Sequence, residues 1–290
     1  MMVMRWAAIL VWLLVCGGVV SAQEGDAAKS KVELGSRTAK AGFQNEDEIR
    51  DKFNNWKADA DARAWLEAMK HSVAEVTSVS ATKPHGEKAD VEVTVKSKAG
   101  ESKTSERVER ISIKLVSSAN GFNQIDKRWL KTYATMWKMP PDVVEALKLF
   151  VGETPPGESS RDKRRMYLNE LDQNAQQAVV EFFTANKAEI VSDLLAGDGL
   201  HASDWMMVTH RPQSVTRNVS EGEGGDKSKW VIRSSADAIQ FYSDGPVELT
   251  KSGNLKIGRI TMQRKGGDNG RDTAKMLQFK INPVQLFDAK

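Results

Sequence analysis

The stretch "ADVEVTVKS", residues 89–97, alternates apolar and polar side chains with the period of two that is typical of a β-strand. One side of the predicted strand carries valines, and the other side begins with Asp90 and Glu92. Such alternation indicates an antiparallel strand that buries one face. The stretch therefore predicts a sheet and shows on which side of it the core lies.

A second strand of the same kind is predicted at 109–117, "ERISIKLVS", where Ser112 and Lys114 stand on the polar side. The connection "KAGESK" contains Gly100, which suits a hairpin turn. If the two strands pair, Asp90, Glu92, Ser112 and Lys114 share one polar face.

Two interpretations of that face are open at this point. Antiparallel pairs commonly turn their polar face to water, which requires no chemistry. The alternative is a metal site, in which an aspartate oxygen holds a divalent cation and a lysine stands beside it to act on a phosphate. The spacing alone does not decide between them.

The rest of the chain predicts an α/β domain around this pair. Apolar residues recur at helical intervals in 45–72, 125–138, 140–150 and 174–197. A further strand is predicted at 73–81, and the chain from Asp204 onward is rich in strands joined by short turns.

The first 22 residues have the pattern of a secretory signal peptide. Arg5 precedes the apolar run "WAAILVWLLVCGGVV", and small residues lead up to Ala22. The run is shorter than the ~20 apolar residues of a transmembrane helix. We therefore expect a leader at 1–22, a polar tether at 23–31 and a single domain at 32–290.

The leader bears on location and on redox chemistry. If it is used, the protein is periplasmic or secreted, without stable membrane association after its removal; if the start is assigned too far upstream, the protein is cytoplasmic. The one cysteine, Cys16, lies in the leader. The mature chain therefore has neither disulfides nor thiolate metal ligands.

The net charge does not by itself indicate a nucleic-acid partner. It is +3 for the whole chain, and removal of Arg5 leaves +2. The basic residues are nevertheless clustered, with "RDKRR" at 161–165 and nine Lys or Arg against three Asp in 251–290. Local basic patches are typical of phosphate-binding surfaces, although charge runs are also common on solvated faces.

The segment "QRKGGDNGR", residues 263–271, combines three cations with three glycines between two predicted strands. A glycine-rich turn accounts for the glycines. It does not account for the cations, which can contact phosphates or the edges of guanine bases. The sequence lacks the G-x-S-x-G and H-E-x-x-H patterns of other hydrolases, and its four histidines are scattered, as surface or packing residues would be.

From Lys31 to its end the chain resembles the HinP-one-I type II restriction endonuclease family. The longest matching segments are "VELGSRTAKAGFQNE" (32–46), "IKLVSSANGFNQIDKRWL" (113–130) and "GRITMQRKGGDNGRDTAKMLQFKINPVQLFD" (258–288). The resemblance implies the PD-(D/E)XK nuclease fold, an α/β fold with a central mixed β-sheet flanked by helices and a strand-rich C-terminal DNA-reading part. It also implies Mg²⁺-dependent hydrolysis of double-stranded DNA after the first G of GCGC.

The resemblance assigns roles to individual residues of the active site. The metal-binding aspartate falls on Asp90, the catalytic lysine on Lys114, and a glutamate near the site on Glu46. Ser112 replaces the family's glutamine, and Glu92 stands where the family has asparagine. We expect Glu92, or a water held by Ser112, to complete the shell of oxygen ligands around the metal.

The resemblance also implies a set of DNA-contacting residues, among which Phe122 enters the base stack. The set is Phe122, Asn123, Gln124, Lys127, Arg164, Gln263, Arg264, Lys265, Asn269 and Arg271.

Double-stranded DNA is thus the expected partner, with a cognate cytosine methyltransferase expected genetically, and the resemblance is consistent with a homodimer. Two alternatives are carried forward. One is an exported nuclease of the same fold with relaxed specificity. The other is a catalytically impaired DNA-binding relative, which the replacement at Ser112 allows.

Overall fold

The computed structural model describes residues 19–84, 88–99, 103–200, 202–211, 228–267 and 271–289, with side chains from residue 37 onward. Most of the predicted leader lies outside these residues. Within them, no helix combines the length and the apolar character needed to cross a membrane.

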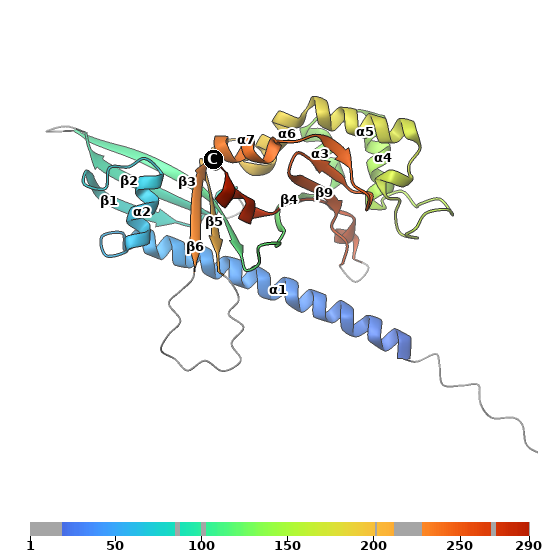
Figure 1. Cartoon of the computed structure of the whole chain (residues 1–290), viewed down its shortest axis with the longest axis horizontal. Helices are drawn as coiled ribbons and strands as arrows, with labels where there is room; N and C mark the ends of the chain where they lie inside the picture. Colours follow the sequence, from blue (N-terminus) through green and yellow to red (C-terminus); the bar gives the residue numbers. More distant parts are fainter. Residues whose placement is uncertain are drawn as a thin grey trace, which may run out of the picture.

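Two five-stranded sheets organise the described part of the chain (Figure 1). The first sheet has the order β1-β2-β3-β5-β6, and its neighbours are antiparallel except for the parallel pair β3 and β5. Its strands are β1 (Val76–Thr82), β2 (Val91–Lys98), β3 (Thr104–Val116), β5 (Trp205–His210) and β6 (Lys229–Ser234).

The second sheet is antiparallel throughout, in the order β4-β10-β9-β8-β7. Its strands are β4 (Asn123–Arg128), β7 (Val247–Leu249), β8 (Leu255–Ile257), β9 (Ile260–Arg264) and β10 (Leu277–Ile281). The expected mixed sheet with helices and a strand-rich C-terminal part is therefore confirmed.

Helices pack on both sides of the first sheet, as Figure 1 shows. On one side lie α1 (Val19–Asn54) and α2 (Ala60–Ala68). The other side is covered, together with the second sheet, by α3 (Leu130–Met136), α4 (Pro141–Val151), α5 (Gln173–Ala185), α6 (Lys187–Leu195) and α7 (Ser235–Ser243).

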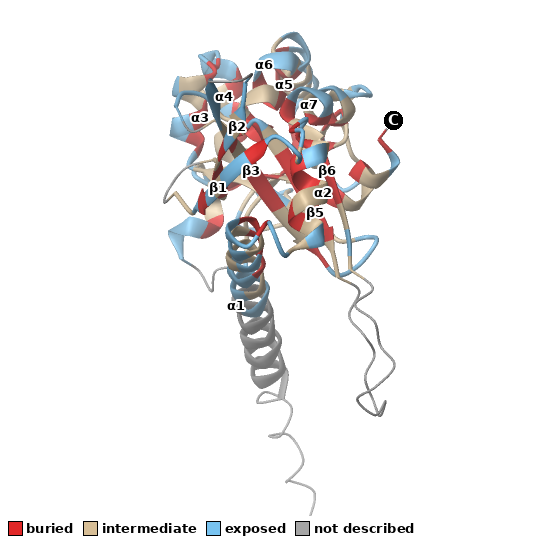
Figure 2. Cartoon of the chain, turned by 90° about the vertical axis from the view of Figure 1, so that its left-hand side faces the viewer, coloured by how far each residue is buried: buried red, intermediate tan, exposed pale blue. Residues whose placement is uncertain are grey.

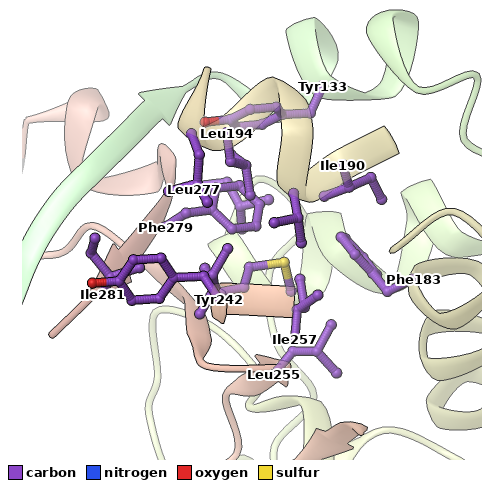
Figure 3. Close-up of a cluster of buried hydrophobic side chains, with 14 of the residues drawn as sticks. Tyr133, Phe183, Ile190, Leu194, Tyr242, Leu255, Ile257, Leu277, Phe279 and Ile281 are labelled. Atoms are coloured by element: carbon purple, nitrogen blue, oxygen red, sulfur yellow. The ribbon is translucent and has the colours of Figure 1, made fainter. Parts of the chain in front are cut away.

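Each side of the first sheet has its own hydrophobic core, and the buried residues of its central strands stand out in Figure 2. The valines of β2 pack with Ile111 and Ile113 against Phe53 and Trp65 of the two N-terminal helices. The opposite core contains Tyr133, Phe183, Leu194, Leu277 and Phe279, which gather between the helices and the second sheet (Figure 3).

Three expectations about secondary structure are wrong. The predicted helix at 125–138 is the end of β4 followed by α3, because residues 123–128 pair with β10. The predicted helix at 174–197 is interrupted at Asn186, which caps the end of α5. The third is the polar tether at 23–31, whose backbone continues helix α1.

One histidine is a buried packing residue, in agreement with the sequence analysis. Nε2 of His71 lies 2.8 Å from Oε1 of Glu109, and the indole of Trp205 donates to the other carboxylate oxygen at 2.6 Å. Burial raises the pKa of Glu109, but these hydrogen bonds and the charge of Arg107 outweigh burial and hold the pKa below its ordinary value. The pair ties α2 to the first sheet.

Candidate functional site

Asp90, Ser112 and Lys114 meet where β2 begins beside β3. The register pairs Val91 with Ile111, so Asp90 stands opposite Ser112. Oδ2 of Asp90 accepts a hydrogen bond of 2.6 Å from the backbone N–H of Ile113. The same oxygen lies 3.4 Å from Oγ of Ser112 and 3.4 Å from Nζ of Lys114. The structure thus brings together the three residues that the sequence places on one polar face.

This cluster is partly enclosed rather than spread over an open sheet face. Ser112 is buried beside Met206 of β5, while the side chains of Asp90 and Lys114 are 26% and 16% exposed. The Lys114 ammonium also donates to Oγ of Ser112 at 3.1 Å and to the carbonyl of Ile113 at 2.8 Å. Charges in such a setting interact more strongly than charges in open solvent.

Glu46 approaches the same cluster from helix α1. Burial and the negative charge of Asp90 raise the pKa of Glu46, while Lys83 and Lys114 oppose this shift. Nζ of Lys83 lies 3.1 Å from Oε2 of Glu46 and holds its carboxylate in place. A second carboxylate therefore lies within electrostatic reach of Asp90 and Lys114.

Glu92, in contrast, has an ion-pair partner within the sheet. Oε1 of Glu92 lies 3.3 Å from Nε of Arg110, the residue directly opposite it in the register. Arg110 also lies 3.5 Å from the carboxylate of Asp204. The role of Glu92 as a metal ligand stays a prediction, and this geometry favours Glu46 as the second carboxylate.

The donors at the cluster suit a divalent cation bound by oxygen. The side-chain hydrogen bonds of Asp90 to other described residues all end on Oδ2, which leaves Oδ1 for another ligand. Glu46 supplies further carboxylate oxygens, and Mg²⁺ commonly takes one or two carboxylates together with waters and substrate phosphates. Within the described parts of the chain, no group of three or more His, Cys, Asp or Glu side chains forms a complete metal cage.

The segment that enters β4 carries the predicted wedge residue. Phe122 is 57% exposed and Gln124 is also exposed, so both are accessible to a partner. Asn123 turns inward instead, and its side-chain amide donates to the carbonyl of Leu115 at 2.9 Å. Lys127 is half-buried on the same strand.

The 263–271 segment joins β9 to β10, as its flanking patterns predicted. Gly266 and Gly267 have φ values of 63° and 75°, which an L side chain rarely adopts, so the turn depends on glycine there. Arg264 donates from Nε to the carbonyl of Val151 at 2.8 Å. Arg271 is exposed, Gln263 and Lys265 are half-buried, and Asn269 lies outside the described residues.

The "DKRR" segment lies beside this hairpin and enlarges its basic surface. Burial lowers the pKa of Arg264, and the positive charges of Arg165 and Arg164 lower it further. Arg165 stacks at 4.1 Å on Tyr167, whereas the side chain of Arg164 is 74% exposed and pairs with Asp162 at 2.9 Å. Two basic segments that are far apart in sequence thus lie close enough for their charges to interact.

Two lysines near the cluster were not identified from the sequence. Lys83 holds Glu46 through the ion pair described above, and Lys88 is enclosed two residues before Asp90. Burial lowers the pKa of Lys88 to about 8, although the charge of Asp126 opposes the shift. Neither lysine belongs to a periodic pattern, so only their tertiary contacts distinguish them from other lysines.

Comparison with known proteins gives a family and a fold. A family model described as R.HinP1I restriction endonuclease matches residues 69–287. Among solved structures, a crystal structure of the restriction endonuclease MspI in complex with its cognate DNA matches with a TM-score of 0.57 and 14% sequence identity. The match covers 91% of this chain and 99% of that one. No curated protein matches the chain.

Because Phe122 is exposed, its truncation should leave the fold almost unchanged. We expect Phe122→Ala to alter the free energy of unfolding by less than about 0.5 kcal/mol, as surface substitutions usually do. Phe53→Ala is the matched control, since Phe53 is fully buried, and it should lose about 3–5 kcal/mol. Urea denaturation of both variants measures the difference. A loss for Phe122→Ala as large as that for Phe53→Ala would make Phe122 a core residue.

Proposed function

The chain belongs to the R.HinP1I restriction endonuclease family, and on that basis we propose that it hydrolyses double-stranded DNA at GCGC, after the first G, with Mg²⁺ as its cofactor. Family membership makes it a type II restriction endonuclease. The observation that carries the proposal is the cluster of Asp90, Ser112 and Lys114, which assembles a carboxylate and a lysine within one family-matched region.

In this mechanism Asp90 and Glu46 would hold the metal. Oδ1 of Asp90 and the carboxylate of Glu46 supply hard oxygen ligands of the kind that Mg²⁺ prefers. The bound ion would polarise the scissile phosphate and lower the pKa of an attacking water. The hydrogen bond from the Ile113 N–H to Oδ2 fixes the orientation of the Asp90 carboxylate.

Lys114 is the group that stabilises the negative charge developing on the phosphate. Its ammonium is held by Asp90, Ser112 and the carbonyl of Ile113, so it needs little reorganisation before reaction. Ser112 is shorter than the family's glutamine, and in our proposal its hydroxyl mainly orients Lys114.

DNA recognition is proposed to combine two surfaces. The exposed Phe122 inserts into the base stack, at a cost of a few kcal/mol for unstacking, which a better fit of the bent duplex offsets. The basic surface formed by the 161–165 and 263–271 segments contacts phosphates and guanine edges. MspI, which shares the fold, was solved in complex with its cognate DNA.

The proposal implies partners beyond the substrate. A nuclease that cuts so short a site requires protection of the host genome, so a cognate cytosine methyltransferase is the expected genetic partner. GCGC has a scissile bond on each strand. A homodimer could cut both bonds in one complex, and a monomer could cut them one after the other.

Purified protein incubated with plasmid DNA and Mg²⁺ tests the function directly. We expect discrete fragments with ends inside GCGC, and no cutting of a plasmid that lacks this sequence. Asp90→Ala and Lys114→Ala should abolish cutting while a gel shift with DNA persists, because neither change removes the basic surface. A smear of fragments would instead support relaxed specificity, and a gel shift without cutting by the unchanged protein would support the catalytically impaired relative.

The choice between Glu46 and Glu92 as the second metal ligand is testable by the Mg²⁺ requirement. We expect Glu46→Gln to raise the Mg²⁺ concentration for half-maximal cutting by about 10–100-fold, as loss of groups at a metal site commonly does. Glu92→Gln is the matched control. It should leave the Mg²⁺ concentration for half-maximal cutting unchanged, since Glu92 is paired with Arg110. The reverse result would assign the metal to Glu92.

Lys265 and Arg164 are expected to differ in what they recognise. Lys265→Met should cost about 1–3 kcal/mol on GCGC duplexes and little on scrambled duplexes, if Lys265 reads a base. Arg164→Met should weaken both duplexes equally and reduce the salt dependence by about one phosphate contact. Fluorescence anisotropy titrations at several salt concentrations measure both. An equal loss on both duplexes for Lys265→Met would remove its base-reading role.

A further inference from the structure

Lys88 is a buried lysine at the entrance to β2, two residues before Asp90. Its side chain is 15% exposed, and Nζ donates to the carbonyl of Ile125 at 3.0 Å and to the carbonyl of Leu194. Nζ also lies 3.6 Å from Oδ2 of Asp126. Two of the three ammonium donors thus bond backbone carbonyls, and the Asp126 carboxylate lies close enough to form an ion pair.

The three acceptors belong to two elements, β4 and α6, which lie against each other. Ile125 and Asp126 belong to β4, and Leu194 lies in the last turn of α6, where carbonyl groups lack helical partners and favour a cation. Lys88 therefore joins the segment that leads into Asp90 to both β4 and α6.

The carboxylate of Asp126 is fixed from its other side as well. The hydroxyl of Tyr133 donates to Oδ1 at 2.5 Å, and the guanidinium of Arg128 spans both carboxylate oxygens at 3.1 Å each. Asp126 would thus stay paired if Lys88 lost its charge. This makes it possible to remove the Lys88 contact without leaving a buried carboxylate unpaired.

Strand β4 is also tied to the other half of the cluster. The side-chain amide of Asn123 donates to the carbonyl of Leu115, the residue after Lys114. Strand β4, which follows the exposed Phe122, therefore has two links to the cluster. Asn123 bonds the residue next to Lys114, and Lys88 connects β4 to the segment just before Asp90. The charges of both Asp90 and Lys114 also act on Lys88.

We propose that Lys88 is a positioning residue that couples the DNA-facing strand β4 to the catalytic Asp90. This inference rests on the proposed function. When DNA displaces Phe122 and Gln124, the movement of β4 reaches the segment before Asp90 through the Ile125 and Asp126 contacts. A buried ion pair is weak evidence for stability, because apolar side chains of the same volume often stabilise as well. The contacts of Lys88 link three segments at one point, and a role in orienting Asp90 explains them better than a role in stabilising the fold.

Lys88→Met distinguishes an effect on the orientation of Asp90 from an effect on DNA binding. Methionine keeps most of the side-chain volume of lysine and removes its hydrogen-bond donors. We expect the single-turnover cutting rate at saturating enzyme to fall by about 100-fold, the effect of a misplacement of about 1 Å. The Kd for a GCGC duplex, measured in Ca²⁺, should stay within about threefold. Lys187→Met is the matched control: Nζ of Lys187 also donates to a carbonyl, that of Gly245, at the other end of α6, and cutting should be unchanged.

Conservative and paired variants complete the test. Lys88→Arg, which keeps the charge and donors, should restore part of the cutting rate. Combined with Phe122→Ala, Lys88→Met should show a loss smaller than the product of the two single losses, because both act in one sequence of contacts. If Lys88→Met does not fold, Asp126→Asn decides by the same comparison of rate and Kd, since the asparagine oxygen can still accept from Tyr133 and from Nε of Arg128 while the ion pair with Lys88 is lost.

Several results would overturn the proposal. They are an unchanged cutting rate in the folded variant, a loss of binding that equals the loss of cutting, or losses that multiply in the double variant. These results are distinct from failure of the proposed function, in which the unchanged protein itself would not cut GCGC plasmids.

Discussion

The register between β2 and β3 is the constraint on which the rest of the structure depends. Side chains alternate between the faces of a strand, so a slip of one residue would move the valines of β2 out of the core and turn Asp90 away from Lys114. The pairing of Val91 with Ile111 prevents this, because those residues pack against Phe53 and Trp65. The same register that buries the apolar face therefore assembles the polar cluster on the other.

The second sheet contributes to this site through β4, its edge strand. One end of β4 presents Phe122 to solvent, and its interior residues are bonded to the segments that carry Asp90 and Lys114. The exposed Phe122 and the cluster of Asp90, Ser112 and Lys114 thus belong to different sheets that share a few polar contacts.

The charged residues likewise form two groups, one at the Asp90 cluster and one at the basic surface. At the cluster, two carboxylates and a lysine lie in a partly enclosed setting, where burial and the charge of Asp90 raise the pKa of Glu46 against the opposing charges of Lys83 and Lys114. At the surface, cations from the 161–165 segment and the 263–271 hairpin lie close enough to lower the pKa of Arg264. A divalent cation can neutralise the carboxylates at the cluster, and a polyanion can neutralise the cations at the surface.

The sequence by itself determined the β2–β3 hairpin, its polar face and the β9–β10 connection, because strand alternation and turn chemistry are local properties that neighbouring residues carry. It did not reveal β4, whose residues 125–128 continue a helical pattern and become a strand because residues 126–128 pair with residues 277–279 of β10. Local pattern likewise did not pair Glu92 with Arg110 or enclose Lys88, and it was the family resemblance, not periodicity, that placed Glu46 near Asp90. These contacts join residues distant in sequence, and no local periodicity records which distant charge or strand a side chain will meet.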